Sequence, residues 1–159
     1  MIYTTYFSKL RSLPYNIAPI SISRFPPKGV NILEYKTLAP SPELLRSYKA
    51  TGDWAAYVST YDNSVLSKLN PHKVVDDLLS LAKTANIALV CFEKDYLHCH
   101  RHLVAEWLYS YGYNITEYGV PMRLRETGDH DLGLIEREEG RELYRADHLD
   151  SLEDSGPWF

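Results

Sequence analysis

The sequence has no long hydrophobic run. Its longest apolar stretch, at residues 87–92, is far shorter than the roughly 20 residues that a membrane-spanning helix needs. The first residues, Met-Ile-Tyr-Thr-Thr-Tyr, also lack the basic start and the apolar stretch of a signal peptide. We therefore expect a cytoplasmic protein that does not contact a membrane.

Cysteine is scarce, because only Cys91 and Cys99 are present. In a reducing compartment these two residues are expected to be thiols rather than a disulfide. The sequence also contains no Gly-x-Gly-x-x-Gly, no Walker loop, no His-Glu-x-x-His and no Cys-x-x-Cys. These absences leave a dinucleotide cofactor and ATP hydrolysis without support, and we predict no cofactor and no metal.

The composition is that of one globular domain with an acidic extension. Charged residues make up 24% and hydrophobic residues 45% of the 159 residues, which are ordinary values. Residues 119–159 carry a net charge of −6, whereas residues 1–118 carry +2. We predict an α/β domain at 1–118, compatible with an anionic ligand, and an acidic extension at 119–159. The extension has too few apolar residues to fold alone and should pack on or near the domain.

The pattern of helices and strands predicts a doubly wound α/β fold. The fold should have a mostly parallel sheet with helices on both faces and with ligands at the carboxyl ends of the strands. A near-continuous apolar run after an amphipathic helix is typical of a central parallel strand. Ser41-Pro42 and Asn70-Pro71 are typical helix starts. The expected strands are 1–7, 17–25, 87–92 and 114–118, and the expected helices begin near residues 42, 54, 71 and 100.

Polar and reactive side chains crowd the junction between the buried strand at 87–92 and the next helix. Such a group is costly to fold unless most of its members face a cleft, so we interpret it as the functional site. Unpaired N–H groups at the start of the helix and the fork of Arg101 suit a phosphate or a carboxylate. The same surroundings should lower the pKa of Cys99. The group consists of Glu93, Lys94, His98, Cys99, His100, Arg101 and His102.

Two separate motifs resemble a known family. Cys-x-Glu-Lys at 91–94 is followed by Cys-His-Arg at 99–101, and Arg-Phe-Pro-Pro-Lys at 24–28 follows the second predicted strand. Over residues 1–118 the chain thereby resembles the domain-of-unknown-function 488 (DUF488) family. The resemblance implies an α/β fold but no particular reaction. It also implies a shared site made of Arg24, Glu93, Lys94, Cys99, His100 and Arg101.

The favoured hypothesis is an enzyme that acts on a nucleotide, a nucleoside or a nucleic-acid end. One carboxylate beside several cationic groups suits glycosidic or phosphate-ester chemistry, so a hydrolase, a glycosidase or a transferase fits. Glu93 would act as general base or stabilise a cation. The expected partner is a small anion such as a nucleotide or phosphate, with nucleic acid as a second possibility. The predicted catalytic residues are Glu93, Cys99 and His100, and the predicted ligand-binding residues are Arg24, Lys28, Lys94 and Arg101.

Three alternatives stay open. In a thiol enzyme, His98 or His100 would activate Cys99 as nucleophile, although Arg101 lies too close for the phosphate loop of a cysteine phosphatase. A nucleotide-binding or nucleic-acid-binding module would bind a ligand without forming a product. Zinc ligation by the cysteines and histidines is disfavoured, because adjacent residues do not readily face one tetrahedral centre.

Overall fold

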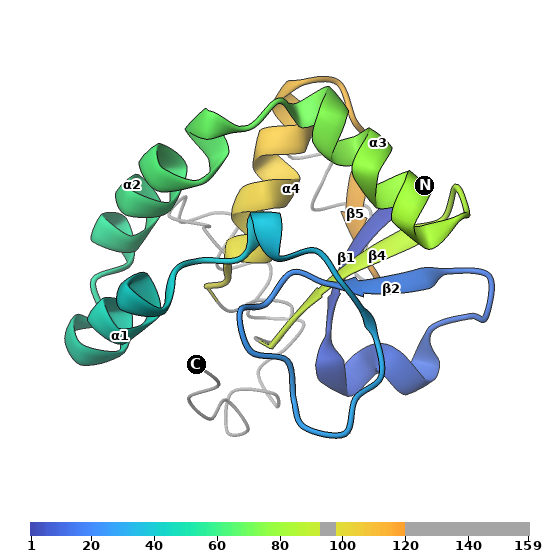
Figure 1. Ribbon diagram of the computed structural model, residues 1–159, viewed down its shortest axis with the longest axis horizontal. Coiled ribbons are helices and arrows are strands. Elements are labelled where there is room, and N and C mark those ends of the chain that lie inside the picture. The colour runs from blue at the N-terminus through green and yellow to red at the C-terminus, as the bar shows by residue number, and fades with distance from the viewer. Residues whose placement is uncertain (93–97, 120–159) are drawn as a thin grey trace.

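A five-stranded sheet forms the centre of the fold (Figure 1). The computed structural model describes residues 1–92 and 98–119, and every strand pair in this part of the chain is parallel. The predicted α/β class is thereby confirmed. The strand order is β3-β2-β4-β1-β5. The strands are β1 (Ile2–Tyr6), β2 (Ala18–Ser21), β3 (Leu33–Glu34), β4 (Ile87–Cys91) and β5 (Ile115–Glu117).

Strand β4 lies in the middle of the sheet and is buried along its whole length. It pairs with β1 on one side and with β2 on the other. A strand covered on both faces needs apolar side chains in both directions, which explains the uninterrupted apolar run from Ile87 to Cys91. The end of this strand therefore brings Cys91 to the carboxyl edge of the sheet.

Local signals in the sequence account for the helix starts. The Ser41 hydroxyl accepts a hydrogen bond from the Leu44 N–H at 3.1 Å, and the Asn70 side chain accepts one from the His72 N–H at 2.9 Å. A proline follows each cap at the first helical position. The α-helices of the described residues are α1 (Pro42–Thr51), α2 (Trp54–Ser64), α3 (Pro71–Ala82) and α4 (His100–Ser110).

Helices α3 and α4 and a short 3-10 segment lie on different sides of the sheet. Figure 1 shows α3 and α4 above the strands and η1 (Phe7–Ser12) below them. Two further 3-10 segments, η2 (Lys36–Leu38) and η3 (Leu66–Lys68), flank the pair α1 and α2. The core includes fully buried side chains from the sheet, α2, α3 and α4, among them Leu89, Tyr61, Leu78 and Val104.

The direction of the chain connections reverses between β2 and β4. After β2 the chain moves outward to β3 at one edge of the sheet. After β4 it moves the other way, past β1, to β5 at the opposite edge. In open parallel sheets such a reversal separates the loops beyond the two adjacent strands and leaves a crevice for ligands. The sheet topology therefore points to the carboxyl ends of β2 and β4 as the place for a site.

Two details differ from the sequence prediction. Strand β2 ends at Ser21, short of the predicted Phe25, and strand β3 was not predicted. Both residues of β3 are exposed, so the segment has no apolar alternation that would indicate a strand. The predicted extension at 119–159 lies outside the described residues except for Gly119. Within the described ranges, the helices are too short or too polar to cross a membrane.

Candidate functional site

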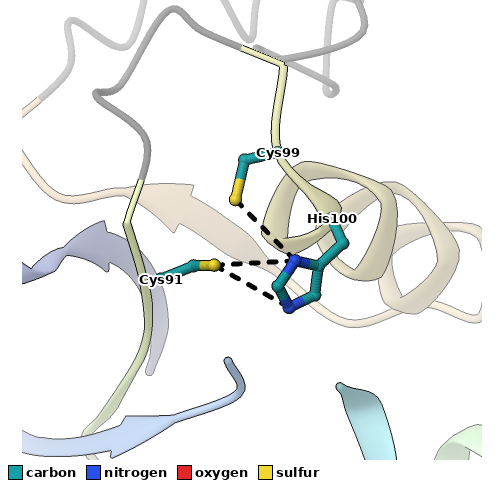
Figure 2. A group of neighbouring side chains, drawn as sticks. All are labelled: Cys91, Cys99 and His100. Carbon is teal, nitrogen blue, oxygen red and sulfur yellow. Dashed lines mark hydrogen bonds between the residues drawn. The ribbon is translucent and has the colours of Figure 1, made fainter. Parts of the chain in front are cut away.

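Two thiols and one imidazole meet where β4 ends and α4 begins (Figure 2). The Cys91 sulfur lies 3.5 Å from Nδ1 of His100, and the Cys99 sulfur lies 4.0 Å from the same nitrogen. All three side chains are buried. The cluster thus joins the end of the central strand to the first turn of the following helix.

The His100 ring is fixed by a backbone carbonyl just beyond β2. Its Nε2 lies 2.7 Å from the oxygen of Ile22. A carbonyl oxygen only accepts hydrogen bonds, so Nε2 carries the hydrogen and Nδ1 of the neutral ring keeps its lone pair. Both sulfurs lie within 4.0 Å of Nδ1, and the Cys91 sulfur also lies 3.9 Å from Nε2, beside the part of the ring between the two nitrogens (Figure 2). The contact also places the cluster at the reversal point between β2 and β4.

Backbone geometry explains how adjacent residues reach one centre. Cys99 is the N-cap of α4 and has extended angles, φ −156° and ψ 143°, whereas His100 is the first helical residue. The change from extended to helical backbone turns both side chains toward Cys91. The sequence argument that adjacent residues do not face one centre is therefore wrong for Cys99 and His100.

The pKa values of the two thiols are shifted in opposite directions. Burial raises the pKa of Cys99, but the hydrogen bond to Cys91, the charge of Arg101 and the His100 imidazole outweigh it and hold this pKa well below its usual value. Burial and the neighbouring Cys99 hold the pKa of Cys91 well above its usual value. The predicted lowering of the Cys99 pKa is confirmed in direction. Its main favourable contribution is the Cys91 hydrogen bond, which the sequence analysis did not include.

Arg101 forms a buried ion pair with Glu117 at the end of β5. Nη2 of Arg101 lies 3.0 Å and Nε lies 3.2 Å from Oε1 of Glu117, and both side chains are 0% exposed. The Thr4 hydroxyl donates to the other oxygen of the same carboxylate. Burial lowers the pKa of Arg101, but Glu117, Cys99 and Cys91 together raise it by more, so the guanidinium stays charged. This pair connects the start of α4 to the sheet.

Two buried side-chain nitrogens of α4 have no hydrogen-bond partner among the described residues: Nη1 of Arg101 and Nε2 of His102. Burial and the nearby Arg101 charge hold the pKa of His102 well below its usual value, so its ring is neutral. Nη1 is a charged donor and is the part of Arg101 that Glu117 leaves unused. The prediction that Arg101 binds an anion stays a prediction, and in this structure its other donors bind Glu117.

The remaining predicted residues lie apart from the cluster or outside the described residues. The Arg24 guanidinium donates to the carbonyls of Pro40 and Ala39, at 2.9 and 3.4 Å, and thereby holds the loop before α1 beside the end of β2. Lys28 is exposed in the loop after β2. Glu93 and Lys94 lie outside the described residues, so their predicted roles stay predictions.

Aromatic side chains of helix α2 pack against His98 and His100. The Tyr61 ring contacts His100 edge-on, with ring centroids 5.7 Å apart, and Trp54 stacks on His98 at 4.6 Å. Tyr61 is held in place because its hydroxyl donates to the Leu38 carbonyl at 2.6 Å. These rings exclude water from one side of the two histidines.

The sequence analysis missed three contributors to the site. Cys91 was part of the family motif but was not among the predicted catalytic or ligand-binding residues. Glu117 and the Ile22 carbonyl carry no local signal, because they reach the site only through the strand order.

Cys91, Cys99 and His100 also form a possible set of metal ligands. Their ligand atoms all lie within 4.8 Å of one another. Sulfur and imidazole donors suit zinc rather than magnesium or calcium. Among the residues that the structure describes, no other group of three His, Cys, Asp or Glu side chains has ligand atoms this close together.

The fold and the site define an α/β protein with a paired-cysteine and histidine centre at the reversal point of a parallel sheet. A family model described as the active DUF488-N3 subclade matches residues 2–112. The chain therefore belongs to the DUF488 family, as the motifs predict. No curated protein and no solved structure matches the chain.

Proposed function

We propose that this protein is a cysteine-dependent enzyme that acts on a small anionic substrate of the nucleotide class, with Cys99 as the nucleophile. The relay from Cys99 through His100 to the Ile22 carbonyl carries the proposal. A nucleophile next to a base, with the base oriented by a third group, is the arrangement that thiol enzymes use. Its location at the reversal point between β2 and β4 agrees with the rule for ligand sites in open sheets.

In the proposed reaction, Nδ1 of His100 takes the proton of the Cys99 thiol while the sulfur attacks the electrophilic atom of the substrate. A bond from Sγ to that atom forms, and the bond to the leaving group breaks. The protonated His100 then gives its proton to the leaving group. Water attacks the covalent intermediate, His100 takes one proton from this water, and that proton returns to the Cys99 sulfur as it leaves.

The surrounding residues support this role. Nε2 of His100 keeps its hydrogen bond to Ile22 throughout, which stabilises the imidazolium formed during the reaction. The Cys91 thiol stabilises a thiolate at Cys99 by a hydrogen bond. Charge from Arg101 acts on the same sulfur. The wording of the family description, an active subclade, also agrees with catalysis.

Nucleotides remain the proposed substrate class because Nη1 of Arg101, the donor that Glu117 leaves unused, suits an anionic group. The first turn of α4 adds N–H groups, and the N-cap Cys99 does not bind them with its side chain. The roles proposed for Glu93 and Lys94 in holding or activating the substrate are tested by substitution. The alternative, a non-catalytic binding module in the cytoplasm, can be told apart from the enzyme by one measurement. Such a module binds the ligand but releases no product.

The experiment combines labelling and turnover. Metal-free protein is treated with iodoacetamide with and without nucleoside monophosphates and 5′-phosphorylated oligonucleotides, and the modified cysteine is located by mass spectrometry. We expect Cys99 to react first and a substrate to protect it. Turnover should disappear in Cys99→Ser and persist in part in Cys91→Ser, the matched control. Full turnover in Cys99→Ser refutes the nucleophile.

A further inference from the structure

The ligand atoms at the junction of β4 and α4 already have the spacing of a metal site. The Cys91 and Cys99 sulfurs lie 3.5 and 4.0 Å from Nδ1 of His100, and all three ligand atoms lie within 4.8 Å of one another (Figure 2). Around a tetrahedral zinc ion, with bonds of about 2.0–2.3 Å, neighbouring ligand atoms are about 3.5–3.8 Å apart. The Cys91 sulfur also lies 3.9 Å from Nε2, so coordination requires the Cys91 side chain to rotate toward the Nδ1 lone pair.

We infer that Cys91, Cys99 and His100 bind one divalent cation of the zinc class through two sulfurs and Nδ1. This inference differs from the sequence prediction of no metal. The sequence could not show that an extended N-cap followed by a helical residue turns both side chains to one point. It also could not show that β4 ends opposite that point.

The orientation of His100 favours metal binding. Metal-binding histidines almost always donate their second ring N–H to a carbonyl or a carboxylate, which fixes the tautomer and the ring. His100 already donates Nε2–H to the Ile22 carbonyl at 2.7 Å, and this leaves Nδ1 for the ion. The ring would therefore keep its tautomer and its hydrogen bond to Ile22 on binding.

Charge and burial favour a divalent ion over a monovalent one. Cys91, Cys99 and His100 are 5%, 3% and 3% exposed, and two thiolates in such a place are costly unless a cation neutralises them. The nearest guanidinium, Arg101, is already paired with Glu117. A divalent ion with two thiolates has no net charge. The soft sulfur donors select zinc over magnesium and calcium.

Three protein ligands leave one tetrahedral position, which in zinc proteins takes water or substrate. The metal site itself does not depend on the function proposed above. One consequence does rest on it, because a Cys99 sulfur bound to the ion cannot attack a substrate. We therefore expect Zn²⁺ to inhibit the thiol reaction and a chelator to restore it.

The direct test is titration of the reduced, metal-free full chain with Co²⁺ and then with Zn²⁺. We expect one ion per chain, an absorption band from thiolate-to-cobalt charge transfer, and displacement of cobalt by zinc. Calorimetry in buffers of different ionisation enthalpy should show proton release, because both sulfurs bind as thiolates. The charge-transfer band reports sulfur ligation in the wild-type protein, whether or not the variants fold.

Variants locate the ion. Changes around a metal that leave all its ligands in place cost about 10–100-fold in affinity, so Cys91→Ser, Cys99→Ser and His100→Ala should each weaken Zn²⁺ binding by at least about 100-fold. His72→Ala is the matched control, because His72 lies on α3 and binds Tyr113 outside the cluster. It should bind zinc as the wild type does.

Two outcomes overturn the inference: no charge-transfer band with Co²⁺, or unchanged Zn²⁺ affinity in folded variants of the three ligands. Neither outcome affects the thiol enzyme, which is judged by labelling and turnover in metal-free protein. Conversely, one tightly bound zinc together with unimpaired turnover in Cys99→Ser supports the metal site and refutes the nucleophile. Activity that requires zinc refutes the proposed inhibition and the nucleophile but retains the metal site.

Discussion

Replacement of Glu117 by glutamine should strongly destabilise the protein. The carboxylate receives hydrogen bonds from Thr4 and from two nitrogens of Arg101, and both members of the ion pair are 0% exposed. Glutamine keeps the shape of the side chain but removes its charge. Arg101 would then be a buried cation without its carboxylate partner, while Nη1 has no hydrogen-bond partner among the described residues.

The size of the effect follows from the burial of the pair. Breaking a buried ion pair by removing one partner costs about 3–5 kcal/mol. A domain has a total unfolding free energy of about 5–15 kcal/mol, so the loss is a large part of it. With a urea dependence of about 2 kcal/mol per M, the midpoint of unfolding should fall by about 1.5–2.5 M.

The assay is urea denaturation of the full chain at neutral pH, followed by circular dichroism. Glu43→Gln is the matched control, because its pair with Arg46 is 74% and 71% exposed, and it should change stability by less than about 0.5 kcal/mol. The double variant Glu117→Gln with Arg101→Met should recover much of the loss, since no charge remains buried. If Glu117→Gln and Glu43→Gln have the same midpoint, the reasoning about the buried pair is refuted.

Two further substitutions test the helix ends. Ser41→Ala removes the acceptor of the Leu44 N–H and should cost about 1 kcal/mol in urea denaturation; an unchanged midpoint would show that the cap contributes nothing. Lys83 closes α3 in the left-handed region at φ 55°, so Lys83→Gly should stabilise the protein by about 0.5–1 kcal/mol in the same assay. Lys83→Ala keeps the Cβ atom and should be close to wild type, and equal gains in both variants would contradict the backbone explanation.

Local sequence signals were sufficient for most helices and for the central strand. Asn70 followed by a proline starts α3 at the predicted position, and the apolar run at 87–92 is the buried strand β4. Such signals act within a few residues, through a cap, a fixed proline φ or the burial of both faces. Strand β3 has two exposed residues and no such signal, and only its pairing with β2 defines it.

The sequence by itself also pointed to the candidate site, because Cys99, His100 and Arg101 follow one another at a single strand-to-helix junction. It did not determine what those side chains contact. Parallel strand order brings the Ile22 carbonyl to His100 from 78 residues away and Glu117 to Arg101 from 16 residues away. As a result, Arg101 lies in a buried ion pair, and Cys91 joins the cluster. These contacts depend on which strands are neighbours in the sheet, and only the tertiary structure decides that.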